Sequence, residues 1–196
     1  MSDAPEIPEA EDPFAKRIAI SIAVLAVALS LIGNLGDNAK TDSIIKTTAA
    51  ANQWGYFQAK SIKEHGYVLD KDLLSVLAPA AVDPAKRDDL LKGYDKKIAK
   101  YETEKKQIGF GEQDAQGNYQ EIKDDQGKVI ISAKEYEEAA AHGIKINDRC
   151  DQASLLLQIA VILCSVAILV RMHTFWFVGL GVGALGTAVG VTAFFM

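Results

Sequence analysis

The sequence predicts an all-α membrane protein with three transmembrane helices. A helical, coiled-coil-like soluble stalk lies between the first and second, and carries a small β-hairpin insertion. Apolar runs without a charged side chain occupy residues 18–35, 155–170 and 175–196. Runs of roughly 17 to 25 apolar residues span the hydrocarbon core as helices, because lipid offers no partner to unpaired backbone amides. Between the first two runs, apolar residues recur at heptad spacing among charged ones.

The chain divides into five predicted segments. In order these are an acidic tail at 1–15, a transmembrane helix at 16–35, a soluble domain at 36–152, and transmembrane helices at 153–171 and 175–196. The tail is acidic and punctuated by Pro5, Pro8 and Pro13, so we expect disorder. Lys16 and Arg17 before the first run resemble a signal peptide. The run is long for one and no convincing cleavage site follows, so we expect an uncleaved anchor, with cleavage as the alternative.

Short charged segments predict the orientation. Lys16, Arg17 and Arg171 fall on one side of the membrane, because the chain crosses it twice between them. The positive-inside rule places that side in the cytoplasm. We therefore expect a bacterial cytoplasmic (inner) membrane protein with a cytoplasmic N-terminus, and with its central domain and C-terminus outside. Of its two cysteines, Cys150 would lie just outside the membrane and Cys164 within it.

Small residues recur along each apolar run, at spacings that place them on one helical face. The three faces consist of Gly179, Gly183, Gly186 and Gly190; of Ala153, Leu157, Ala160, Cys164 and Ala167; and of Ala19, Ala23, Ala26, Ser30 and Gly33. Small side chains let helix backbones approach closely in lipid. We predict that these are helix-packing faces. Whether each meets another helix of the chain or a second subunit is open.

The soluble segment shows three helical patterns. Asp42 or Ser43 can cap a helix that runs toward Leu77, and Pro79 and Pro84 separate it from the next. The second helix carries an apolar stripe at Leu91, Tyr94, Ile98, Tyr101 and Ile108. The third begins with a capping box from Ser132 to Glu135. Its stripe then continues unbroken into the second membrane run, which predicts a single helix.

Residues 109–131 are predicted to form a β-hairpin at the tip of the stalk. Asp114-Ala-Gln-Gly117 and Asp124-Asp-Gln-Gly127 have turn chemistry, and the apolar residues 129–131 favour a strand. A calcium-binding loop is the sharper interpretation, but the alternating ligand spacing is absent.

The composition offers no chemistry for catalysis. No phosphate loop, dinucleotide fingerprint or zinc motif occurs, so we expect no catalytic residues, no metal site and no cofactor. The net charge is −5, which gives no nucleic-acid signature. The apolar runs contain no Asp, Glu or Lys, which argues against an ion-coupled transporter.

The candidate binding site is the stretch from Asn52 to Lys63. Its proposed binding residues are Asn52, Trp54, Tyr56, Lys60 and Lys63. Asn52, Tyr56, Lys60 and Lys63 would form a polar helical face, and Trp54 would share another face with Phe57. Trp and Tyr are enriched at binding hot spots. The alternative is that the aromatic residues pack the stalk core while the lysines are solvated.

This stretch, Asn52-Gln-Trp-Gly-Tyr-Phe-Gln-Ala-Lys-Ser-Ile62, resembles a family of small bacterial membrane proteins known only as a domain of unknown function. The Leu-rich start of the C-terminal hairpin, Leu155-Leu-Leu-Gln-Ile, resembles the same family. The resemblance covers most of residues 15–196, and the 109–131 hairpin looks like an insertion. It implies an integral membrane protein, with no assigned activity and no site residues.

We therefore expect a non-enzymatic membrane protein that acts as a self-associating scaffold or partner-binding module. Its expected partners are the lipid bilayer, further copies of itself and an unidentified membrane protein. The alternative is an oligomeric channel, since a pore need not carry charge.

Overall fold

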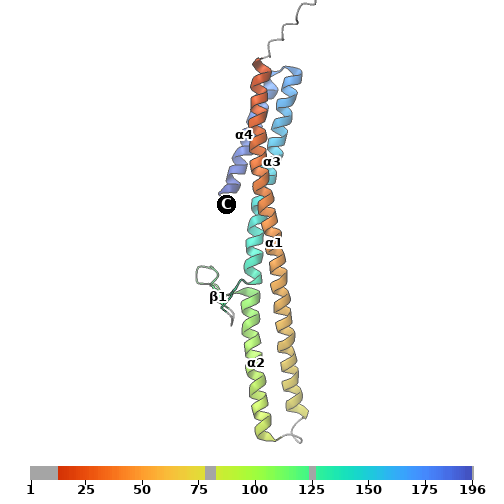
Figure 1. Ribbon diagram of the computed structural model, residues 1–196, viewed down its shortest axis with the longest axis vertical. Coiled ribbons are helices and arrows are strands. Elements are labelled where there is room, and N and C mark those ends of the chain that lie inside the picture. Colours follow the sequence, from red (N-terminus) through yellow and green to blue (C-terminus); the bar gives the residue numbers. More distant parts are fainter. Residues whose placement is uncertain (1–12, 78–82, 124–126, 196) are drawn as a thin grey trace, which may run out of the picture. The chain divides into compact units, whose positions relative to one another are not determined.

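The described part of the chain folds into helices, apart from one small β-hairpin and the connecting turns (Figure 1). The computed structural model describes residues 13–77, 83–123 and 127–195, so the predicted tail lies mostly outside the described residues. The elements are α1 Pro13–Leu77, α2 Pro84–Phe110, β1 Ile122–Lys123, β2 Val129–Ile130, α3 Ala133–Val170 and α4 His173–Phe194. Helices α1, α3 and α4 are long and apolar enough to cross a membrane.

The contacts divide the chain into two compact units. The apolar unit comprises residues up to Thr41 together with those from Gly143 onward, and the central unit comprises Asp42–His142. Both are built from parts of α1 and α3, and each is described by itself below.

The predicted helix start at Asp42 or Ser43 is wrong, because α1 continues through both residues. Asp42 does not cap a helix there. Its carboxylate pairs with Lys46 one turn later, at 2.7 Å, which is a helix-stabilising arrangement. The Ser43 carbonyl accepts a hydrogen bond from the Thr47 hydroxyl at 2.8 Å. No proline interrupts residues 14–78, so the polar residues after the apolar run do not end the helix.

In the apolar unit, α4 buries its glycine face against α3 and α1. Gly179, Gly183, Gly186 and Gly190 are all buried. A Cβ atom at Gly179 would lie 3.1 Å from the Ala160 carbonyl oxygen, and one at Gly186 would lie 3.2 Å from that of Ala153. The glycines therefore let the two backbones approach within van der Waals contact. The facing stripe of α3, from Ala153 to Ala167, is fully buried.

Helix α1 meets the same glycines with large side chains. A Cβ at Gly183 would lie 2.5 Å from Leu25 Cδ2, and one at Gly190 would lie 2.3 Å from Ile32 Cδ1. Leu25 and Ile18 are buried in the core cluster. Bulky α1 residues thus fill the space that α4 leaves open, as close packing requires.

The small-residue face of α1 is consequently unused within the chain. Ala19, Ala23 and Ala26 are exposed, as is Ser30. Small residues there opposite the α4 glycines would leave voids. This face is therefore exposed on the apolar unit.

Both cysteines are buried, so Cys150 is not open to solvent. Cys150 is 1% exposed and Cys164 is 0% exposed. A Cβ added to Gly36 on α1 would lie 2.8 Å from Cys150 Cβ. The α1 backbone therefore packs directly over this thiol.

In the central unit, α2 runs antiparallel to α1 (Figure 1). Lys71 pairs with Asp95 at 2.5 Å, whereas Lys60, earlier on α1, pairs with Glu104, later on α2. Between these pairs, Tyr67 stacks on Tyr101 with ring centroids 5.8 Å apart. The predicted α2 stripe faces inward, since its residues are all half-buried; they are Leu91, Tyr94, Ile98, Tyr101 and Ile108.

The helix starts in the central unit follow the predicted signals. Pro84 opens α2, and the Asp83 carboxylate accepts the Ala85 amide hydrogen bond at 3.0 Å. Pro79 lies outside the described residues. The Ser132 hydroxyl accepts the Glu135 amide at 3.2 Å, and α3 then runs to Val170 as one helix, as predicted.

The β-hairpin forms as predicted but not at the predicted tip. Strands β1 and β2 are antiparallel, pairing Ile122 with Ile130 and Lys123 with Val129. Gly117 and Gly127 adopt φ of 84° and 78°, the left-handed conformation that glycine tolerates. The Asp114 carboxylate accepts backbone hydrogen bonds from Asn118 and Gln116, and those from Asn118 do most to lower its pKa. The segment that carries the hairpin begins beside Trp54, because α2 ends at Phe110 and the Phe110 ring packs against Trp54.

Candidate functional site

A groove of the central unit brings together residues from α1, α2 and the hairpin. Its cavity of about 670 Å³ falls within the range of roughly 300–1,000 Å³ that is typical of small-ligand pockets. Its lining residues are Gln53, Tyr56 and Lys60 from α1, Glu104, Gln107 and Ile108 from α2, and Lys123, Lys128, Val129 and Ile130 from the hairpin.

The α1 wall follows from helical spacing. Gln53, Tyr56 and Lys60 are three and four residues apart, so they share one face of α1. Tyr56 is 63% exposed, which leaves much of its ring and hydroxyl open to a ligand. This wall contains two of the five residues that the sequence singled out.

Lys60 is held by the fold and does not stand free on a polar face. Its ammonium group pairs with the Glu104 carboxylate across the α1–α2 interface and lies 5.2 Å from the centre of the Tyr101 ring. Lys100 approaches the same carboxylate at 3.4 Å. Lys60 therefore lies against α2 and is half-buried, unlike a fully solvated lysine.

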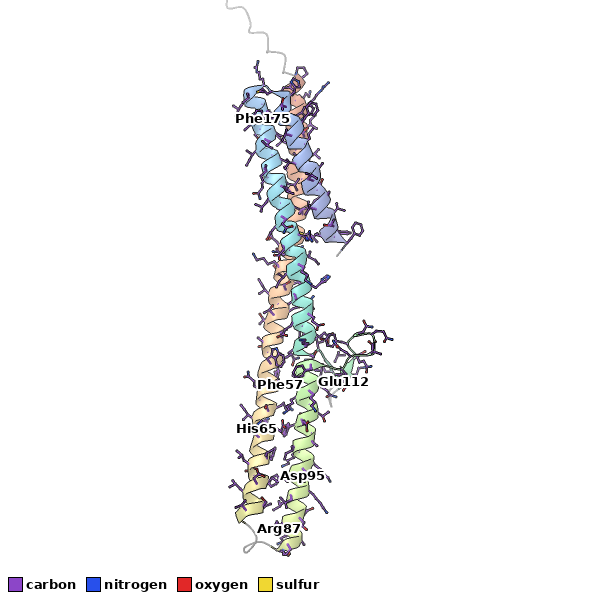
Figure 2. The ribbon with its side chains drawn as sticks, turned by 180° about the vertical axis from the view of Figure 1, so that it is seen from behind. Phe57, His65, Arg87, Asp95, Glu112 and Phe175 are labelled. Atoms are coloured by element: carbon purple, nitrogen blue, oxygen red, sulfur yellow. The ribbon has the colours of Figure 1, made fainter. Side chains whose placement is uncertain are left out.

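Behind the groove, an aromatic cluster fixes the level at which α2 ends. Trp54 and Phe57 pack edge-on with centroids 5.4 Å apart, and both rings contact Phe110. A Cβ at Gly109 would lie 2.8 Å from the Phe57 ring, so only glycine fits there without a shift. The Trp54 indole donates to Glu137 on α3 at 2.8 Å. Figure 2 labels Phe57 on α1 and Glu112 just beyond the end of α2, at the same level of the unit.

The hairpin wall is anchored through Tyr119. A Cβ at Gly111 would lie 3.1 Å from the Tyr119 ring and 2.9 Å from the Ser132 hydroxyl. Burial, together with the nearby Glu138 carboxylate, raises the pKa of Tyr119. Gly111 has φ of 69°, which turns the chain from α2 into this segment. The hairpin is therefore fixed at its base, which positions Lys123 and Lys128 over the groove.

The groove suits binding of a ligand with anionic and apolar parts. Three lysines and one glutamate line it, and Ile108, Val129 and Ile130 supply apolar surface. Lys123 pairs with Glu121 at 3.2 Å, and both side chains are more than half exposed, so a ligand can displace this weak pair. Within the part of the chain that the structure describes, no cluster of His, Cys, Asp or Glu could hold a metal ion.

The remaining predicted residues lie outside the groove lining. Asn52 and Lys63 are exposed on α1, and Trp54 belongs to the aromatic cluster behind the groove. Sequence reasoning missed the α2 and hairpin residues that complete the site. The hairpin itself was predicted, but its place in the lining of the same groove as Tyr56 depends on where α2 ends, which no local pattern indicates.

The model of a family described as a domain of unknown function, DUF4337, matches residues 14–196. No curated protein and no solved structure matches the chain.

Proposed function

The chain belongs to the DUF4337 family, whose function is unknown, and we propose that it is a non-enzymatic, membrane-anchored binding protein. The three apolar helices α1, α3 and α4 would insert into the bilayer, and the central unit would present its groove to a partner. The observation that carries this proposal is the groove itself. Three separate segments build it around Tyr56, and Lys123 and Lys128 add positive charge at its rim.

The partner that best fits is a protein segment with acidic and apolar side chains. Tyr56 offers a large, mostly exposed aromatic surface, which is typical of binding hot spots. The groove also supplies hydrogen-bonding amides at Gln53 and Gln107. These groups can recognise backbone and carboxylate oxygens without any reactive chemistry.

The test is photo-crosslinking from Tyr56. A photoreactive phenylalanine at Tyr56 should capture a discrete partner in native membranes. The same group at Ile62, which is 72% exposed on α1 outside the groove, should not. In the protein that carries the photoreactive group at position 56, the double substitution K123Q/K128Q should reduce capture of the partner. The control K92Q/K96Q, at exposed α2 lysines outside the groove lining, should leave it intact. Equal capture from both sites would contradict the proposal.

Self-association is the second proposed property. It is favoured by the exposed small-residue face of α1 at Ala19, Ala23 and Ala26, because such faces drive helix association in lipid. Ala23→Leu should shift detergent-solubilised protein toward monomer in light-scattering measurements. Val24→Leu, at an exposed position one residue away, is the control. An unchanged mass for Ala23→Leu would exclude this face as the contact. An oligomeric channel would require the same assembly, so planar-bilayer conductance of the wild-type protein separates the two.

We also propose the bacterial cytoplasmic membrane as the location, with the N-terminus in the cytoplasm and the central unit outside. Lys16, Arg17 and Arg171 on short segments support this orientation.

A further inference from the structure

Aromatic side chains at the start of α1 pack against those at the start of α4, next to the connection between α3 and α4. The Phe14 and His173 rings lie 4.1 Å apart between centroids, and Phe14 meets Trp176 edge-on at 6.0 Å. The Trp176 indole donates to the Ser21 hydroxyl at 3.3 Å, and that hydroxyl donates to the Arg17 carbonyl at 3.0 Å. These contacts hold the start of α1 and the α3–α4 connection together at one end of the apolar unit, where they form a single surface.

The charged side chains that the described residues place on this surface are all positive. Lys16, Arg17 and Arg171 are exposed, and no carboxylate among the described residues pairs with them. The acidic residues that the structure describes in the apolar unit are Asp37, Asp148 and Asp151. These lie near the other ends of the apolar helices, among the cations Lys40, Lys145 and Arg149.

We propose that this surface binds the headgroup of an anionic phospholipid, recognised by Lys16, Arg17 and Arg171. Arginine suits phosphate oxygens because its guanidinium group can donate two parallel hydrogen bonds. Trp and other aromatic rings are enriched at the boundary between headgroups and acyl chains, where Trp176 and Phe14 would lie. The inference rests on the proposed insertion of α1, α3 and α4 into the bilayer. It does not depend on the groove.

A competing occupant is the chain's own N-terminal segment. Residues 1–12 include five carboxylates, at Asp3, Glu6, Glu9, Glu11 and Asp12. They directly precede the cations of α1 in the sequence, so the experiment must distinguish them from lipid.

The test uses Trp176 as its probe. The chain contains two tryptophans, so Trp54→Phe leaves Trp176 alone. The full-length Trp54→Phe protein is reconstituted in phosphatidylcholine vesicles that contain brominated phosphatidylglycerol. Bromine quenches Trp176 when the lipid is adjacent, and brominated phosphatidylcholine gives the reference. Each cation near an anionic surface contributes about fivefold to binding. The triple substitution K16Q/R17Q/R171Q should therefore abolish the preference for phosphatidylglycerol.

The control triple substitution K40Q/K145Q/R149Q removes the same charge from the other ends of the helices, and should keep the preference. If K16Q/R17Q/R171Q does not fold, the single substitutions Arg17→Gln and Arg171→Gln should each lower the preference for phosphatidylglycerol about fivefold. An unchanged preference in both single variants would overturn the inference.

Equal quenching by both lipids in the wild-type sequence would overturn the inference. A preference seen only after deletion of residues 2–12 would also overturn it, because the chain's own carboxylates would then occupy the surface. Failure of the protein to float with the vesicles would instead overturn membrane insertion itself.

Discussion

Substitution of Gly183 by leucine should destabilise the apolar unit by overpacking it. The first added atom, Cβ, would lie 2.5 Å from Leu25 Cδ2 and 3.4 Å from Ala160 Cβ. Leu25 is only 7% exposed, so it cannot move out of the way without disturbing the core. Inserting carbons into a packed core typically costs about 1–3 kcal/mol.

The matched control is Gly181→Leu on the same helix. No heavy atom lies within 4 Å of a Cβ at Gly181, and both variants change helix propensity equally. The difference between the two variants therefore reports packing alone. For a chain of 196 residues, a cost of about 1–3 kcal/mol lowers the midpoint of thermal unfolding by about 2–12 °C.

The assay is thermal unfolding in detergent, followed by circular dichroism. Leu25→Ala alone should cost about 2–5 kcal/mol by leaving a cavity. The double variant L25A/G183L should be more stable than the sum of the single effects predicts, with a coupling of about 0.5–3 kcal/mol. Equal midpoints for Gly183→Leu and Gly181→Leu, or simple additivity in the double variant, would refute the packing argument.

Four further predictions concern the central unit and the orientation. Lys105→Met should cost about 1–3 kcal/mol in a urea titration, because it leaves the Glu64 carboxylate, 14% exposed, without its partner. Lys106→Met removes one partner of a pair with largely exposed side chains, so it should cost less than about 1 kcal/mol in the same urea titration. Similar losses of stability in the two variants would contradict the argument from burial. Because the pKa of Tyr119 is raised in the folded state, the folded state holds this proton more tightly. Stability should therefore fall as pH rises above about 10, and Tyr119→Phe should remove this part of the decline; an identical pH profile for both proteins would disprove it. With native Cys150 and Cys164 silent, an impermeant thiol reagent should label Ser75→Cys in intact cells and Met172→Cys only after lysis. The opposite pattern would reverse the proposed orientation. Deletion of residues 112–128 should leave the helical circular dichroism of α1 and α3 largely unchanged while abolishing partner capture at Tyr56, because it removes Lys123 and Lys128; retained capture would show that the hairpin is not part of the site.

The sequence patterns predicted the helices and the hairpin more reliably than they predicted the contacts between them. The α3 stripe from Ala153 to Ala167 and the capping signal at Ser132 act within one helix, so their spacing was sufficient. Asp42 failed as a helix start because a capping residue can equally pair one turn onward, here with Lys46. A true helix start at Asp42 would have needed a proline or a break in the helical pattern before it, and the sequence has neither there.

The site was harder to predict because it depends on how two helices align. Tyr56 and Lys60 were singled out by residue type, but their surroundings depend on which α2 residues face them. The register of α2 on α1 is fixed by Tyr67, Tyr101 and the Glu64–Lys105 pair. Many alignments satisfy the same heptad pattern, so one sequence could not choose among them.

The junction where α2 ends and α3 begins has a consequence for engineering. Along α1, contacts pass from α2 at Phe110 to α3 at Glu137, and Trp54 touches both. Helices α2 and α3 are therefore each held on α1 by contacts outside the chain that connects them. The turn at Asp114–Gly117, with exposed Gln116 and Gly117, lies on the opposite side of Tyr119 in sequence from the groove-lining lysines. A fluorescent or epitope tag inserted there should therefore report on the protein in living cells and leave the helix contacts on α1 and the groove lining in place.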